Sequence, residues 1–139
     1  MTSSTQAATH TIVLYSDDAG IRDRMRTAIG RRPARDIRVK FLEAATYDEV
    51  ISLVDEHDVD LILLDGEAWP AGGLGIARQL RDELDEVPAL CVVVARAADR
   101  WLAAWSRADA VLLHPLDPVH TAETVADLLR RRSVTASVS

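Results

Sequence analysis

The fold is decided by one stretch of the sequence, Asp58-Val59-Asp60-Leu61-Ile62-Leu63-Leu64-Asp65-Gly66-Glu67. Four consecutive apolar residues between two aspartates indicate a short strand that is buried on both faces, because a strand with one open face alternates apolar and polar residues. Open parallel sheets bind their ligands beyond the carboxyl ends of the strands, where the strand order reverses. Asp65 ends this strand and is therefore the first candidate for chemistry, the alternative being a solvated loop carboxylate.

The composition is that of an ordinary globular protein. With 139 residues, 27% charged and 48% hydrophobic, the chain is expected to form one soluble domain. Its net charge of −6 argues against nucleic acid as the main partner. No apolar run approaches the roughly 20 residues of a membrane helix, and the first ten residues do not resemble a signal peptide. The single cysteine, Cys91, lies in an apolar run and has no partner for a disulfide within the chain. We therefore expect a cytoplasmic protein that does not contact membranes.

Hydrophobic periodicity predicts five strands that alternate with five helices. The strands are expected at 11–15, 37–42, 61–64, 89–94 and 110–113, and the helices end near residues 29, 56, 84, 106 and 132. Residues 1–10 are expected to be a disordered N-terminal segment, 11–132 the domain, and 133–139 a polar tail. Such alternation predicts an α/β fold, a doubly wound five-stranded parallel sheet, for which the order 2-1-3-4-5 is common at this size.

This strand order would bring the ends of the first and third strands together. Asp17, Asp18 and Asp65 are then expected to converge on one crevice. Crowded carboxylates repel one another, and the usual remedy is a hard divalent cation such as Mg²⁺ held by oxygen ligands. The sequence therefore predicts a Mg²⁺ site made by these three residues.

From about residue 11 to residue 132 the chain resembles the receiver domain of two-component response regulators, which has a flavodoxin-like fold. The matching pieces are Asp17-Asp18 after the first strand, Asp65 after the third, Arg107-Ala108-Asp109 before the fifth and His114-Pro115 after it. The resemblance implies that Asp65 is the phosphoacceptor for a histidine kinase and that Asp17 and Asp18 hold Mg²⁺. It also implies a cis peptide bond before Pro115.

Three positions depart from the receiver pattern. His114 stands where receivers have a lysine that pairs with the phosphoryl group, and Lys40 is the only lysine of the chain. A neutral imidazole supplies one N–H donor and no full charge. Ala95 replaces the expected serine or threonine, and Val111 replaces the aromatic residue that moves inward on activation. Three parts of the usual switch are therefore missing together.

Other residues have a structural and a functional interpretation. Glu67 adds a carboxylate near the expected phosphate, and Trp69 is either a loop anchor or a lid over the acids. Trp101 and Trp105 either pack in the core or form an apolar partner surface, which receivers also use for homodimers. Half of the sixteen basic residues lie between Arg22 and Lys40, as a solvated face or as the docking surface for a kinase or phosphotransfer partner.

These features lead to one main functional hypothesis and two alternatives. The main hypothesis is an atypical stand-alone receiver, a signalling docking module with a degenerate phosphorylation switch and not an enzyme. It would bind a histidine kinase, a phosphotransfer protein or an output protein. The first alternative is a receiver that still accepts a phosphoryl group on Asp65 with Mg²⁺. The second is a phosphatase that uses Asp65 as nucleophile and Glu67 as acid and base.

Overall fold

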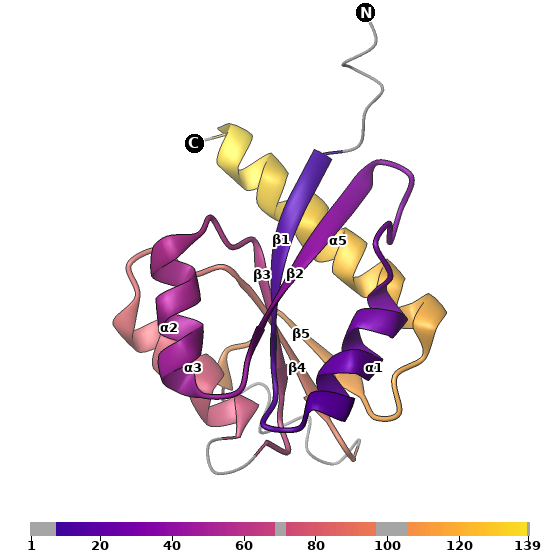
Figure 1. Ribbon diagram of the computed structural model, residues 1–139. Helices are drawn as coiled ribbons and strands as arrows, with labels where there is room; N and C mark the ends of the chain where they lie inside the picture. Colours follow the sequence, from indigo (N-terminus) through magenta and orange to yellow (C-terminus); the bar gives the residue numbers. More distant parts are fainter. Residues whose placement is uncertain (1–7, 69–71, 97–105, 139) are drawn as a thin grey trace, which may run out of the picture.

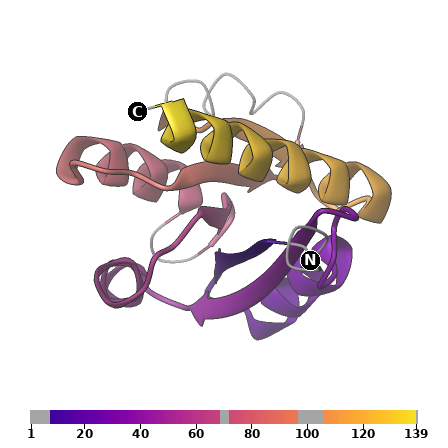
Figure 2. The same cartoon turned by 90° about the horizontal axis from the view of Figure 1, so that it is seen from above.

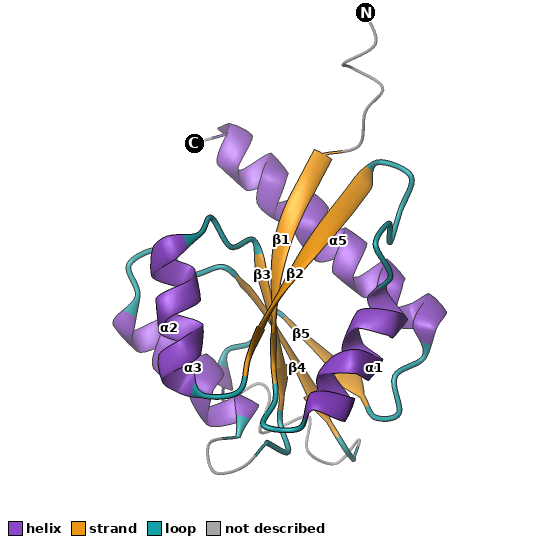
Figure 3. Ribbon diagram, viewed as in Figure 1, coloured by secondary structure: helices purple, strands orange, loops and turns teal. Residues whose placement is uncertain are grey.

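The computed structural model describes residues 8–68, 72–96 and 106–138. In these ranges, the strands and helices follow one another in the predicted order, and only the helix expected between β4 and β5 falls outside them, apart from Ser106 (Figure 3). The elements, with the labels of Figure 1, are β1 (Ala8–Tyr15), α1 (Ala19–Ile29), β2 (Ile37–Ala44), α2 (Tyr47–Glu56), β3 (Leu61–Asp65), α3 (Gly73–Glu83), β4 (Ala89–Val94), β5 (Ala110–Leu113) and α5 (Pro118–Val138).

The five strands form one parallel sheet in the order β2-β1-β3-β4-β5. Helices α1 and α5 pack on one face of the sheet, and α2 and α3 pack on the other (Figures 1 and 2). The predicted fold class and strand order are confirmed. The order reverses at β1 and β3, so the carboxyl ends of these two strands lie side by side.

The central strands β3 and β4 hold the two layers of the core together. Every residue of both strands is buried. Leu61 and Leu63 face the layer of α1 and α5, while Ile62 and Leu64 face the layer of α2 and α3. Burial of an aliphatic side chain stabilises a fold by about 1.5–3 kcal/mol, and a slip by one residue would exchange the two faces. The position of Asp65, the last residue of β3, is therefore fixed by the core.

Cys91 lies within β4 and is a free thiol with no exposed surface. Burial, together with the charge of Asp109, raises the pKa of this thiol to about 12. It is therefore a small apolar core residue, as the sequence indicates.

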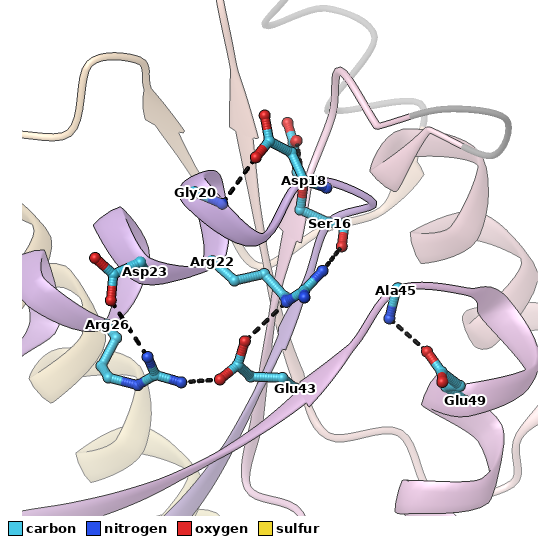
Figure 4. A network of polar contacts seen from close by, with 10 residues as sticks. Ser16, Asp18, Gly20, Arg22, Asp23, Arg26, Glu43, Ala45 and Glu49 are labelled. Atoms are coloured by element: carbon cyan, nitrogen blue, oxygen red, sulfur yellow. Dashed lines mark hydrogen bonds and ion pairs between the residues drawn. The ribbon is translucent and has the colours of Figure 1, made fainter.

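Two helices begin at the caps that the sequence predicts. At α2, Glu49 donates its N–H to Thr46 Oγ1 at 3.2 Å, and its carboxylate accepts the N–H of Ala45 at 2.6 Å (Figure 4). At α5, the N–H of His120 donates to Asp117 Oδ2 at 2.9 Å. The contacts of Thr46 and Asp117 each satisfy an amide that the helix leaves without an internal partner, and the Glu49 carboxylate binds the amide just before the cap of α2.

Both ends of the domain differ from the expected boundaries. Strand β1 begins at Ala8 and pairs with β2 from Ile37 onward, so part of the expected disordered segment 1–10 is a strand. Pairing satisfies backbone groups whatever the polarity of the side chains, which explains why the polar sequence there was misleading. Helix α5 continues to Val138 instead of ending at Arg132, because neither glycine nor proline interrupts the expected polar tail 133–139.

Several expectations fall on residues outside the described ranges. They are the helix at 98–106, apart from Ser106, and the roles of Trp69, Trp101 and Trp105. Among the described residues, no helix combines the length and the apolar character that crossing a membrane requires.

Candidate functional site

Asp65 is the centre of a buried polar cluster at the carboxyl end of β3. The register pairs Tyr15 of β1 with Leu64 of β3, so the next residues, Ser16 and Asp65, also lie beside each other. The hydroxyl of Ser16 donates to Asp65 Oδ2 at 2.8 Å in a buried hydrogen bond. Asp65 is 3% exposed, so this carboxylate depends on protein groups for its hydrogen bonds.

The second oxygen of Asp65 is also engaged. Oδ1 accepts the N–H of Glu67 at 2.9 Å, and His114 Nε2 lies 3.4 Å from the same oxygen. His114 follows β5 and is held by its own N–H, which donates to the carbonyl of Val94 at 2.9 Å. The peptide bond from His114 to the next residue, Pro115, is cis, the isomer that the resemblance implies. Residues that follow β1, β3 and β5 thus surround the carboxylate of Asp65.

These contacts decide the charge of Asp65. Burial alone would raise the pKa of the carboxyl group, but the hydrogen bonds of His114, the Glu67 amide and Ser16 outweigh burial and lower it. A lowered pKa means that the folded protein favours the ionised carboxylate. Asp65 is therefore a buried anion that its neighbours stabilise.

Replacement of Asp65 by asparagine is expected to remove part of the acid sensitivity of the fold. Because its pKa is lowered, the carboxylate stabilises the protein above the unfolded-state pKa of about 3.9, and this stabilisation is lost as the pH falls through the folded-state pKa. We expect D65N to be less stable than the wild type near neutral pH by about 1–3 kcal/mol, since asparagine cannot accept all three contacts. Urea unfolding at several pH values measures the difference, which should shrink toward pH 3. A difference that stays constant with pH would show that the charge is not the cause.

The structure does not gather the three predicted acids into one metal site. Among the described residues, no group of three or more His, Cys, Asp or Glu side chains is arranged to hold a metal ion. Asp18 is instead the N-cap of α1, and its carboxylate accepts the N–H of Gly20 at 2.8 Å (Figure 4). Asp17 stays near the site: burial, followed by the charges of Asp17 and Asp65, raises the pKa of Tyr15. A metal site made by Asp17, Asp18 and Asp65 is therefore not found among the described residues, and their role as Mg²⁺ ligands stays a prediction.

Ser16 is the functional residue that the sequence did not reveal. It precedes the acid pair by one position, and only the strand register shows that it lies beside Asp65. Arg22 of α1 donates to the carbonyl of Ser16 and forms an ion pair with Glu43 of β2 at 2.8 Å. Arg26 binds the other oxygen of Glu43, so both arginines hold α1 to β2, and Arg22 also holds it to the loop that carries Ser16 (Figure 4). The bonds from Arg22 outweigh burial and lower the pKa of Glu43.

The remaining candidate residues lie in different parts of the fold around Asp65. Ala95 is exposed just after β4, and Val111 in β5 is half-buried against the layer of α2 and α3. Glu67 contributes its backbone N–H to Asp65, whereas the residue as a whole is exposed. Lys40 pairs with Thr11 in the sheet, four residues before the end of β1, which places its backbone about 13 Å from the site. Among the described residues, the basic side chain in contact with the Asp65 carboxylate is therefore His114 and not Lys40.

No protein family model matches the chain. Over 120 residues, it is 46% identical to an uncharacterized response regulatory protein of Mycobacterium tuberculosis, found in strains CDC 1551 and H37Rv; the match covers 86% of this chain and 90% of the relative. Among solved structures, the signal receiver domain of a putative Luxo repressor protein from Vibrio parahaemolyticus is similar, with a TM-score of 0.78 and 14% identity over 95% of this chain and 98% of that one. That structure agrees with the fold described above.

Proposed function

Since this chain belongs to the response regulators and has their receiver fold, we propose that it is an atypical receiver that acts as a docking module and does not depend on phosphorylation of Asp65. The observation that carries the proposal is the hydrogen-bonding of Asp65. Both of its oxygens already accept bonds, from Ser16 and from the Glu67 amide. A phosphoryl group bonded to one of these oxygens would weaken or displace the contact that this oxygen makes.

The energetic cost of this displacement supports the proposal. Hydrogen bonds to a charged group are worth about 1.5–3 kcal/mol each. A receiver with a lysine beside the phosphoacceptor offsets such a loss by pairing an ammonium group with the incoming dianion. Here His114 occupies that place, 3.4 Å from Asp65 Oδ1. The only lysine, Lys40, lies in β2 opposite Thr11, four residues before the end of β1 that is near Asp65.

We expect the purified protein to stay unmodified when it is incubated with Mg²⁺ and acetyl phosphate. Intact-mass spectrometry after rapid acid quenching measures the addition of a phosphoryl group. The variant H114K, which restores an ammonium group beside Asp65, is expected to become at least partly phosphorylated, and H114K/D65N is the matched negative control. A phosphoryl group on the wild-type protein that disappears in D65N would reject the proposal.

A second candidate function rests on the position of His114. Protonation would give this side chain a positive charge next to Asp65, whose lowered pKa keeps the carboxylate ionised. The chain could then accept a phosphoryl group on Asp65 from a histidine kinase, with Mg²⁺ held near Asp17. The acetyl phosphate reaction separates this function from the first. Hydrolysis of a generic phosphate ester that is lost in D65N would indicate the phosphatase, for which the exposed Glu67 is a poor acid and base.

The family also suggests where the protein acts and what it binds. Response regulators interact with kinases or with output proteins. We propose that a histidine kinase, a phosphotransfer protein or an output protein is the partner, that the protein is cytoplasmic, and that homodimers form through the surface of the helix expected at 98–106, β5 and α5.

A further inference from the structure

The turn before β2 and the first half of that strand carry an unbalanced positive charge. Of the ten residues from Arg31 to Lys40, five are basic and one, Asp36, is acidic, although the whole chain has a net charge of −6. Asp36 is already paired with Arg130 of α5, through hydrogen bonds of 2.7 and 3.1 Å. These bonds outweigh burial and lower the pKa of Asp36. The single acid of the segment therefore does not neutralise its basic neighbours.

All five of these basic residues are exposed, and we call four of them the β2 basic surface: Arg31, Arg35, Arg38 and Lys40. Within the described part of the chain, none of the four side chains forms an ion pair or a side-chain hydrogen bond. The nearby Arg32 donates to the carbonyl of Arg35 at 3.0 Å, and no carboxylate of the described residues pairs with its charge. Residues 1–7 contain no acidic side chain that could supply one.

The strand gives this surface a regular spacing. Side chains alternate along β2, so Arg38 and Lys40 lie on the same face, about 6.6 Å apart along the strand. This is the face that α2 covers farther along, where Leu42 packs in the core. In the sheet, the neighbour of Arg38 is Thr9, which is exposed. Figure 1 shows the first residues of β1 and β2 rising beyond α2, and Arg38 and Lys40 are exposed.

We propose that the β2 basic surface binds an extended acidic segment of a partner protein. An extended chain presents same-face side chains at the spacing of Arg38 and Lys40, so alternate carboxylates of one segment can reach both. A nucleic acid duplex carries one charge per 1.7 Å and needs a wider basic footprint than this acidic protein offers. If a second copy of this chain bound the surface head to tail, the β2 basic surface of that second copy would stay free. Further copies would then add and form filaments.

The inference rests on the docking role proposed above, but not on the state of Asp65. The β2 basic surface lies at the amino-terminal end of the strands, whereas Asp65 lies at the carboxyl end of β3. A partner could therefore bind the β2 basic surface whether or not Asp65 is modified. Failure of peptide binding would reject this inference alone, while phosphorylation of Asp65 would reject the proposed function alone.

The test uses the full chain and a fluorescein-labelled peptide in which glutamate and threonine alternate. Fluorescence anisotropy is expected to show binding that weakens with added salt, and no binding of a peptide with glutamine in place of glutamate. R38Q/K40Q should lower the affinity about tenfold, since each exposed ion pair contributes up to about 1 kcal/mol. The control R24Q/R107Q removes the same charge from exposed residues elsewhere and should lower it less than twofold.

Four results would overturn the inference. One is the absence of salt-sensitive binding to the glutamate peptide, and a second is an equal loss of affinity in R38Q/K40Q and R24Q/R107Q. The third is tighter binding of a labelled DNA or RNA strand, and the fourth is self-association of the protein that R38Q/K40Q abolishes in sedimentation velocity. Thermal unfolding of both double variants checks that each is folded, which the exposure of the substituted side chains leads us to expect.

Discussion

Ser16→Asp is expected to lower the free energy of unfolding by about 3 kcal/mol when no divalent cation is present. The hydroxyl of Ser16 donates to Asp65 Oδ2 at 2.8 Å, and the substitution places a second carboxylate at this position. Asp65 is 3% exposed, so two like charges would be held together with little water around them. One of the two carboxylates would have to bind a proton or the local structure would have to open. Urea unfolding in EDTA near neutral pH measures the loss.

Mg²⁺ should recover part of the stability of S16D. The introduced carboxylate would join Asp65 and Asp17, whose charges already act together on Tyr15. Hard divalent cations bind such oxygen-rich groups, and a ligand that binds only the folded state stabilises it. The control S16A loses the hydroxyl that donates to Asp65 and accepts the N–H of Asp18 at 3.1 Å, which should cost about 1–2 kcal/mol and give no response to Mg²⁺. An S16D variant as stable as the wild type in EDTA would contradict the contact between Ser16 and Asp65, and equal Mg²⁺ responses in S16A and S16D would contradict the introduced ligand.

The fold could be predicted from the sequence because its central strands have an unambiguous pattern. The run Leu61–Leu64 is apolar at every position, and only a strand covered on both faces buries all four side chains. That requirement calls for helices on both faces, and it places Asp65 at the end of the strand. The end of α5 was less predictable, since the residues after Arg132 are polar yet contain no helix breaker.

The site could be predicted only in part, because its geometry depends on register. Asp65 was predicted from its position after a strand and His114 from the resemblance to receivers, and the structure places His114 Nε2 3.4 Å from Asp65 Oδ1. Ser16 has no chemical signature in the sequence, and its role follows from the pairing of Tyr15 with Leu64. An acid after a strand also has a second use, as the cap of the next helix, and Asp18 serves that purpose. Pattern alone does not decide between a metal ligand and a helix cap.

The largest effect of a small substitution is expected at Gly73, the first residue of α3. A Cβ atom at this position would lie 2.7 Å from the carbonyl oxygen of Asp65 and 2.9 Å from Cβ of Leu64. Both atoms belong to β3, which is buried along its whole length and cannot move away. G73A is therefore expected to cost about 2–3 kcal/mol, the usual result of overpacking a core. Urea unfolding measures the change, and the chemical shift of the Asp65 amide should move as α3 is displaced.

Gly75 provides the matched control in the same helix. A Cβ atom there would meet nothing within 4 Å, and the residue is exposed. Alanine at this position loses less backbone entropy on folding than glycine, so G75A is expected to stabilise the protein by about 0.5–1 kcal/mol. The two substitutions add the same methyl group two residues apart, and their opposite signs would follow from contact with β3 alone. If G73A were as stable as G75A, α3 would not pack directly on the strand that carries Asp65, and the rigid placement of that carboxylate would lose its basis.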